Sequence, residues 1–268
     1  MSSPARRARI SRAIQYAILV IVIVVLALLT DWPKMVHTFF NLRVAAEQFP
    51  QVITTALWNT VVYTLISFWF GLLGGALLAL MRMSSVAPYR WIATVYTELF
   101  RGLPALLVFV AFGYGIPSAF SINLNIYVTV MLSLGMVSAA YISETLRAGL
   151  QAVPPGQYEA ARSLGMSRGR AMRSIVFPQA FRMVLPPLTN ELILLTKDTS
   201  LVYLLGLTVD QYELTKFGRQ ALSAADAGLT PLVVAGVCYL VITVPLSWLA
   251  RRFELQTTRT SFKAKAAK

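Results

Sequence analysis

The sequence has few residues that close disulfides or hold metal ions. It contains one cysteine, Cys238, and one histidine, His37. A single cysteine cannot form an internal disulfide, and His37 has no carboxylate or cysteine directly beside it with which to share a metal ion. We therefore expect neither a disulfide framework nor a metal site.

Signatures of nucleotide binding and of catalysis are missing as well. The phosphate-binding pattern Gly-x-x-x-x-Gly-Lys-Ser/Thr does not occur, so we expect no ATP or other cofactor on this chain itself. The apolar runs contain no clustered set of nucleophile, base and metal ligands. These absences predict a protein that is not an enzyme, and they disfavour a membrane-embedded enzyme in particular.

Charge is scarce, and apolar residues dominate. Charged residues make up 13% of the chain and hydrophobic residues 57%, with a mean hydropathy of +0.64. Such a balance is far from that of a soluble domain. A helix needs about 20 apolar residues to cross a bilayer, so 268 residues leave room for several spans and for no separate soluble domain. We predict an all-α integral membrane protein.

Acidic residues are fewer than basic ones, 11 against 24, which gives a net charge of +13. A nucleic-acid-binding protein would gather such cations on a polar module. Here they lie in the gaps between apolar runs, so we expect contact with the lipid bilayer and no nucleic-acid partner.

Six apolar runs are long enough to be membrane spans. They cover residues 14–29, 55–80, 91–114, 126–146, 178–195 and 232–250. We divide the chain into an N-terminal part (1–54), a transmembrane domain (55–250) with a cytoplasmic loop at 148–177, and a basic tail (251–268).

Basic residues decide the expected orientation, because Lys and Arg are enriched in cytoplasmic loops. With six spans, four N-terminal arginines, the loop 82–90, the central basic segment 154–178 and the tail 251–268 all fall on one side. We expect that side to be the cytoplasm, with both chain termini in it. The opposite loops are 31–54, 117–125 and 208–231.

The first apolar run follows arginines and therefore looks like a secretory signal peptide. It is longer than the usual core of such a peptide, and residues 30–34 lack a small-x-small cleavage pattern. We favour an uncleaved first helix over a cleaved signal.

Residues 154–178, PPGQYEAARSLGMSRGRAMRSIVFP, form a basic segment between two apolar runs. Pro154 and Pro155 end the preceding helix, and a new helix is expected from about Gln157. Gly165 suits the left-handed conformation that closes a helix. The pattern predicts a short helix that ends at a turn.

A second short helix is expected after this turn. The side chain of Ser167 can cap it, and we expect it to run over 168–177 until Pro178 breaks it. On the first helix, small and apolar residues share one side, where a partner surface can approach closely. The segment is thus either a docking element or an amphipathic connector on anionic lipid, while a DNA-binding helix-turn-helix is improbable between two spans.

A family resemblance favours docking. The sequence EAARSLG followed by IVFP resembles the EAA signature of the membrane subunits of ABC importers, with a glycine four residues after the second alanine and a distal I-x-x-P. In that family the loop is a coupling helix that fits a cleft on a cytoplasmic ATPase subunit. The resemblance assigns this coupling role to Glu159, Ala160, Ala161, Leu164 and Gly165.

Further motifs resemble those of polar amino acid permeases of the histidine, glutamine, glutamate and arginine type. They are TTALWNTVVYTLISF, ELFRGLP, AAYISETLRAGLQAVPPGQYEAARSLG and LPPLTNELILLTKDTSLVYLLGL. The resemblance implies a type I ABC importer transmembrane fold, in which a five-helix core carries an extra N-terminal helix, in a bacterial plasma membrane. The extra helix departs from the family's common five-span pattern.

The resemblance also implies partners and a mechanism. The partners are two ATP-binding cassette subunits, a second permease chain, identical or homologous, and an extracytoplasmic solute-binding protein. ATP and Mg²⁺ would bind the ATPase subunits, whose cycle would drive import of a polar amino acid by alternating access. The alternative is a stand-alone secondary carrier or channel for a small polar solute, which accounts for the buried charges but not for the central loop.

Charged residues inside spans are costly and suggest function. Glu98 and Arg101, like Glu144 and Arg147, are three residues apart, and we expect each pair to neutralise itself on one helix face. The better candidates for the substrate path lie at the end of the fifth span, where acids and donors for both charged groups of an amino acid come together. They are Asn190, Glu191, Lys197, Asp198, Thr199 and Ser200. A structural alternative is that Lys197 and Asp198 pair with each other where the helix breaks.

Overall fold

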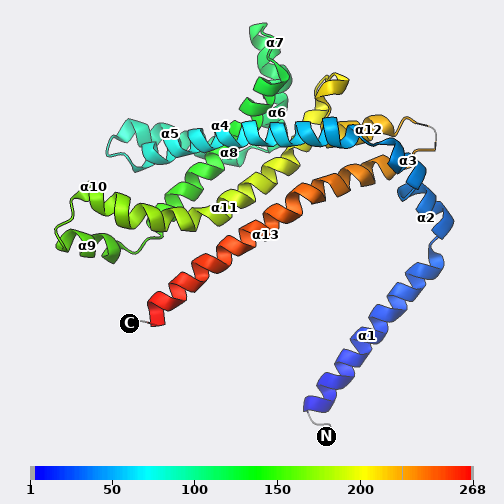
Figure 1. The fold of residues 1–268 in the computed structure, drawn as a ribbon, viewed down its shortest axis with the longest axis horizontal. Coiled ribbons are helices and arrows are strands. Elements are labelled where there is room, and N and C mark those ends of the chain that lie inside the picture. Colours follow the sequence, from blue (N-terminus) through cyan, green and yellow to red (C-terminus); the bar gives the residue numbers. More distant parts are fainter. Residues whose placement is uncertain (1–3, 225, 267–268) are drawn as a thin grey trace.

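A computed structural model describes residues 4–224 and 226–266, and every regular element within them is a helix. Figure 1 shows an elongated bundle in which the long helices run obliquely side by side. Each predicted apolar run lies in helices, and the run 91–114 is interrupted at residues 103–104. The long helices are α1 (Pro4–Leu29), α4 (Trp58–Met83), α5 (Ala87–Gly102), α8 (Ile126–Gln151), α11 (Phe177–Asp198) and α13 (Thr230–Ala266).

Not all of these helices have the length and composition of a membrane span. Within the described residues four do, at 11–29, 52–83, 126–151 and 230–256, or five if α5 and the helices that follow it count as one bent span. Helix α11 falls short because it carries charged residues and two internal prolines, Pro186 and Pro187. Four of the six expected spans are therefore apolar helices long enough to cross a membrane, whereas 91–114 and 178–195 depart from a simple apolar rod.

The predicted single span 91–114 is wrong in its geometry. The chain bends by 103° between α5 and the pair α6 (Ala105–Val110) and α7 (Ile116–Phe120), with the π-helical turn η2 (Ala111–Gly115) between the last two. Leu103 is extended, as a residue before proline prefers to be, and Pro104 donates no backbone hydrogen bond. The helix therefore stops at Gly102 and restarts in a new direction.

The centre of the bundle is the contact between α4 and α8. A β-carbon added at Gly75 would stand 2.8 Å from Ile142 Cγ2, so only glycine permits this approach. The largest buried cluster lies nearer the other end of both helices, where Tyr63, Phe109 and Leu134 are fully buried against neighbouring apolar side chains. Close backbone packing and a few aromatic side chains hold these helices together.

Helix α1 leans away from the bundle (Figure 1). None of the window from Ser11 to Leu29 is buried against the rest of the chain. Two short helices, α2 (Trp32–Phe39) and α3 (Leu42–Glu47), lead from it to the bundle. There the Leu229 N–H donates to the Thr38 carbonyl at 2.7 Å, which ties this connection to the start of α13.

The end of the bundle near α12 (Leu214–Ala221) is fixed by hydrogen bonds from α4. The Asn59 side-chain amide donates to the Asp210 and Tyr212 carbonyls at 2.7 and 3.0 Å, and the Tyr63 hydroxyl donates to the Gln211 carbonyl at 2.9 Å. The chain reaches this point from α11 through two 3₁₀ turns, η4 (Thr199–Leu204) and η5 (Val209–Gln211). A further π-helical turn, η1 (Val52–Leu57), begins the α4 rod.

The central basic segment contains the expected pair of short helices, α9 (Pro155–Ser163) and α10 (Arg168–Ala171). Gly165 between them has φ of +81°, and the Ser167 side chain accepts from the Arg170 N–H. Both predicted turn features are confirmed. Helix α9 starts at Pro155 rather than near Gln157, because the fixed φ of proline suits the first turn of a helix.

The predicted break at Pro178 is wrong. The π-helical turn η3 (Met172–Val176) joins α10 to α11 without interruption. The Phe177 N–H donates to the Met172 carbonyl, five residues back. Such a wide turn leaves room for the ring of Pro178, which is tolerated in the first turn of α11. The second helix of the segment is thus a direct extension of α11.

Candidate substrate path and coupling surface

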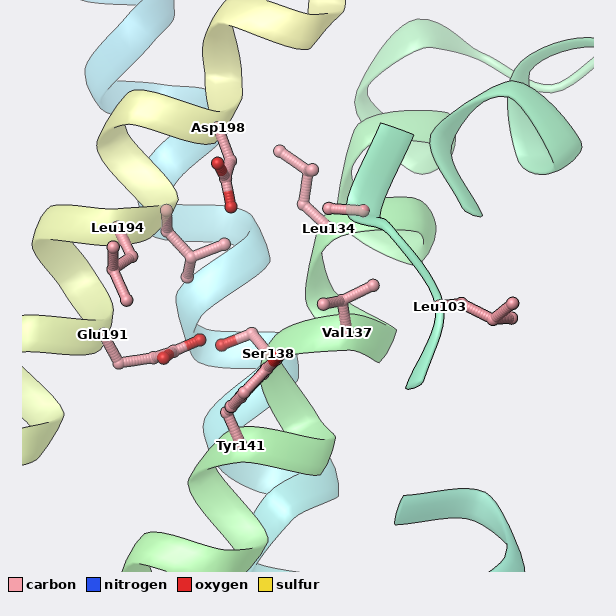
Figure 2. A pocket seen from close by; sticks show the side chains of 10 residues that line it. Leu103, Leu134, Val137, Ser138, Tyr141, Glu191, Leu194 and Asp198 are labelled. Carbon is pink, nitrogen blue, oxygen red and sulfur yellow. The ribbon is translucent and has the colours of Figure 1, made fainter. Parts of the chain in front are cut away.

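A small cavity of about 160 Å³ lies between α8, α11 and the break between α5 and α6. Glu191 and Asp198 line it from α11, Ser138 and Tyr141 from α8, and Leu103 from the break. In Figure 2 the Glu191 carboxylate points toward the Ser138 hydroxyl, and Asp198 lies farther along α11. Ser138 is 1% exposed. This cavity, the acidic cavity below, presents two carboxylates and a hydroxyl.

The structure separates the predicted substrate-path residues. Glu191 and Asp198 lie two helical turns apart and share the acidic cavity. Asn190 and Lys197 are exposed and do not line it. Thr199 is buried and its hydroxyl donates to the Thr196 carbonyl at 2.7 Å.

Ser200, the remaining candidate, is half-buried in η4 and also does not line the acidic cavity. Lys197 and Asp198 form no ion pair within 4.0 Å in the described part of the chain. The structural alternative of a Lys197–Asp198 pair is therefore not seen as a direct ion pair, although Lys197 still acts electrostatically on Asp198.

A larger cavity of about 410 Å³ adjoins the acidic one, and Tyr141 lines both. Its walls are the last turns of α8, with Glu144 and Thr145, the first half of α11, with Met183, and Arg101 from α5. The central basic segment 154–178, called the coupling segment below, lies between α8 and α11 in the sequence. The larger cavity is therefore at the end of the bundle that carries this segment. The two cavities follow one another along α8.

One of the two predicted charge pairs is confirmed. Arg147 pairs with Glu144, and Arg82 of α4 adds a second ion pair to the same carboxylate at 2.5 Å. Glu98 and Arg101 form no ion pair with each other in the described residues. The Arg101 guanidinium instead stands 5.7 Å from the centre of the Tyr141 ring. The prediction for this pair is wrong because α5 turns Arg101 toward α8, not along its own face.

The sequence interpretation overlooked the part that α8 plays in both cavities. Ser138, Tyr141 and Thr145 follow one another at helical spacing, so they share one face of a largely apolar helix. This polar stripe was the available signal. The contribution of Arg101 had no comparable signal, because it depends on the bend after α5.

The surface of the coupling segment combines charged, small and apolar residues. Glu159, Ala160 and Gly165 are exposed, and Leu164 is 83% exposed at the tip. Ala161, in contrast, is 5% exposed and faces its own chain. Arginines surround this tip, and Figure 1 shows α9 and α10 at one extremity of the bundle. A protruding leucine within a charged rim is available for contact with another protein.

Comparison with known proteins identifies the class. Residues 71–259 match the family described as binding-protein-dependent transport system inner membrane component. The arginine transport system permease protein ArtQ of Bacillus subtilis is 35% identical over 207 residues, which cover 76% of this chain and 93% of that protein. The glutamate/aspartate import permease protein GltK of Escherichia coli is 35% identical over 208 residues, covering 74% and 90%.

Comparison with solved structures leads to the same class of protein. The chain is similar to a crystal structure of an amino acid ABC transporter with histidines, with a TM-score of 0.72 and 33% identity over 81% of this chain and 98% of that one. A bacterial ABC transporter involved in the import of alginate shares the fold, with a TM-score of 0.62 at 16% identity. The expected type I ABC importer fold is confirmed, and a stand-alone carrier or channel is not favoured.

These matches cover most of the chain and include the coupling segment and both cavities. The chain is a transport subunit rather than an enzyme, and it belongs to the family of binding-protein-dependent transport system inner membrane components.

Proposed function

We propose that this chain is the permease subunit of an importer that carries a polar amino acid with a cationic side chain into the cytoplasm. The observation that carries the proposal is the acidic cavity, in which Glu191 and Asp198 face the same space and no lysine or arginine joins them. A cationic amino acid has two positive groups, and each can be paired with one of these carboxylates. Glutamate would bring further negative charge into the same space.

The two carboxylates are well spaced for such a solute. Seven residues along α11 correspond to a rise of about 10 Å, which suits a ligand with charged groups at both ends. The Ser138 hydroxyl lies beside the Glu191 carboxylate, at one end of the cavity (Figure 2). The cavity is smaller than the roughly 300–1,000 Å³ of typical ligand pockets, so we infer that it widens when the path opens. The names of two relatives, ArtQ and the arginine permease ArgU of Corynebacterium glutamicum, agree with a cationic substrate.

The proposed cycle needs partners that supply energy and solute. Two ATP-binding cassette subunits would bind ATP and Mg²⁺ and grip the tip around Glu159, Ala160, Leu164 and Gly165, with Ala161 supporting the tip from inside. A second permease chain would complete the path, and an extracytoplasmic binding protein would deliver the amino acid at the end near α12. Closure of the ATPase pair would move α9, and through the unbroken α10–α11 helix this motion reaches Glu191 directly.

The test is uptake by the complete importer in proteoliposomes, with labelled L-arginine, L-glutamine and L-glutamate as probes. We expect ATP-dependent uptake of L-arginine, and we expect Glu191→Gln and Asp198→Asn each to lower it by about tenfold or more, since each removes a charge-assisted contact. Capture of the amino acid by the binding protein should stay unchanged, because both substituted groups belong to the permease.

Glu47→Gln is the matched control. Glu47 is an exposed carboxylate of α3 that pairs only with Arg43 on the surface. It should support uptake at the rate of the unaltered importer. Uptake of L-glutamate in preference to L-arginine, or full uptake by both cavity variants, would contradict the proposed substrate class.

A further inference from the structure

Arg101 is the most unusual charged residue of the larger cavity. It has no ion pair within 4.0 Å among the described residues. Its guanidinium stands 5.7 Å from the centre of the Tyr141 ring and is near enough to Glu144 for an electrostatic interaction. A guanidinium has five N–H donors, and no described residue accepts a hydrogen bond from Arg101. These donors are therefore available to a ligand in the cavity that Arg101 lines.

The other charged group in the lining cannot neutralise Arg101. Glu144 is the single acid there, and both of its carboxylate oxygens already accept from arginines. Arg82 binds one oxygen at 2.5 Å, and Arg147 binds both. Three arginines thus surround one carboxylate. Arg101 is the cation of the cavity lining, and Arg82 and Arg147 behind Glu144 make the surroundings of the larger cavity positive on balance, unlike the lining of the acidic cavity.

The larger cavity also has the size and position of a binding site. At about 410 Å³ it falls within the range of ligand pockets. It follows the acidic cavity along α8, and Tyr141 stands between the two. The larger cavity therefore lies on the way from Glu191 and Asp198 toward the coupling segment.

We propose that the larger cavity is a second, inner binding site, in which Arg101 binds the α-carboxylate of the transported amino acid. This inference rests on the proposed function. The ammonium and side chain of the solute bind first to the acidic cavity. Arg101 then attracts the group that the acidic cavity repels, so the solute is drawn past Tyr141 before release.

The experiment compares ligands that differ only at the carboxylate. Equilibrium binding of L-arginine, of its methyl ester and of its decarboxylated analogue agmatine is measured on the permease–ATPase complex in nanodiscs, without nucleotide and without binding protein. The unaltered complex should bind L-arginine about tenfold more tightly than either analogue, the expected effect of one charge-assisted contact. If the unaltered complex binds all three ligands with equal affinity, the proposal is overturned, and no variant is needed to show it.

Substitution of Arg101 then tests whether this residue causes the tighter binding of L-arginine. Arg101→Gln should remove the preference for L-arginine and leave agmatine binding unchanged, whereas Arg101→Lys keeps the charge and should retain it. Arg90→Gln is the control, because Arg90 is exposed and donates to the Ser84 and Ser85 carbonyls, away from both cavities. If Arg101→Gln weakens all three ligands equally, Arg101 supports the structure and does not bind carboxylate.

Failure of this inference can be told apart from failure of the proposed function. If the complete importer takes up L-arginine with ATP but the preference does not respond to Arg101→Gln, only the inner site is refuted. If no ATP-dependent uptake of an amino acid occurs, the proposed function fails and the inner site fails with it.

Discussion

Two acidic residues, Glu144 and Glu213, are held inside a largely apolar chain in different ways. Glu144 is paired with two arginines from α4 and α8. Glu213 is fully buried at the start of α12 and has no cationic partner among the described residues. Its carboxylate accepts from the Thr215 and Lys216 N–H groups and from the Tyr239 hydroxyl. Neutral donors satisfy the geometry of this carboxylate but do not offset the loss of hydration.

Burial raises the pKa of Glu213 from its ordinary value of 4.5 to about 7. The folded protein therefore binds this proton more tightly than the unfolded protein, so stability falls as the pH rises from about 4.5 to about 7. We expect the free energy of unfolding to be about 1 kcal/mol lower at pH 8 than at pH 6 through this group. The nearby tyrosine hydroxyls do not ionise in this window.

The measurement is the temperature of half-unfolding of the purified protein at both pH values. Glu213→Gln keeps one of the two oxygens that accept from the Thr215 and Lys216 N–H groups, and it cannot titrate, so it should remove this part of the pH dependence. Glu47→Gln, on an exposed carboxylate, should leave it in place. An identical pH response in Glu213→Gln and the unaltered chain would show that Glu213 stays ionised.

At the scale of elements, helix interruptions determine what the chain can do. The extended Leu103 before Pro104 turns the chain by 103° and exposes the end of α5 to α8, which brings Arg101 to the larger cavity. The π-helical turn before Pro178 has the opposite effect, because it keeps α10 and α11 continuous. Pro104 thus redirects the chain beside the cavities, whereas Pro178 lies within a continuous helix.

The turn at Gly165 supplies a prediction for the coupling segment. Its φ of +81° costs a residue with a side chain about 1–2 kcal/mol, although a β-carbon there would meet no atom within 4 Å. Gly165→Val should therefore distort the tip without a clash and lower transport-coupled ATP hydrolysis severalfold, while the amount of protein in the membrane is unchanged.

Gly169→Val is the matched control for this turn. Gly169 also has open space around its α-carbon, but its φ is not positive. ATP hydrolysis by the reconstituted complex, with and without loaded binding protein, distinguishes the two. Equal ATP hydrolysis by both variants would show that the turn at Gly165 is not needed for coupling.

At the scale of the whole molecule, the helices form a core and an appendage. The helices α4, α8, α11 and α13 pack together, whereas no residue from Ser11 to Leu29 of α1 is buried against them. Its apolar surface is suited to lipid on all sides. The sequence-based prediction of six crossings would place both termini on the cytoplasmic side, because basic residues lie at both ends of the chain. Residues 267–268 of the predicted tail, and residues 1–3 of the N-terminal part, lie outside the described residues.

This orientation predicts a labelling pattern with a membrane-impermeant thiol reagent. Cys238→Ala removes the only cysteine of the sequence, and single cysteines are then placed at the exposed positions Ser85, Ser118 and Ser163. Ser118→Cys should react in intact cells, whereas Ser85→Cys and Ser163→Cys should react only in inverted vesicles. Reaction of Ser163→Cys from outside would contradict a cytoplasmic coupling segment.

Hydropathy and local turn chemistry were enough to predict the membrane class, the helical runs, the turn at Gly165 and the cap at Ser167. These features depend on residues close together in sequence, where apolar length and backbone preference decide the outcome. The family signature at residues 159–165 named the class of protein for the same reason, since it is a contiguous motif.

Long-range packing decided the rest. Glu191 and Asp198 were predicted, but only the fold separated them from Asn190 and Lys197, because the facing helix α8 determines which side of α11 borders a cavity. Arg101 was expected to pair with Glu98, three residues away, and instead reached Tyr141, forty residues away, once the chain bent at Pro104. A side chain's partner is set by the direction of its helix, and that direction depends on contacts which no local pattern contains.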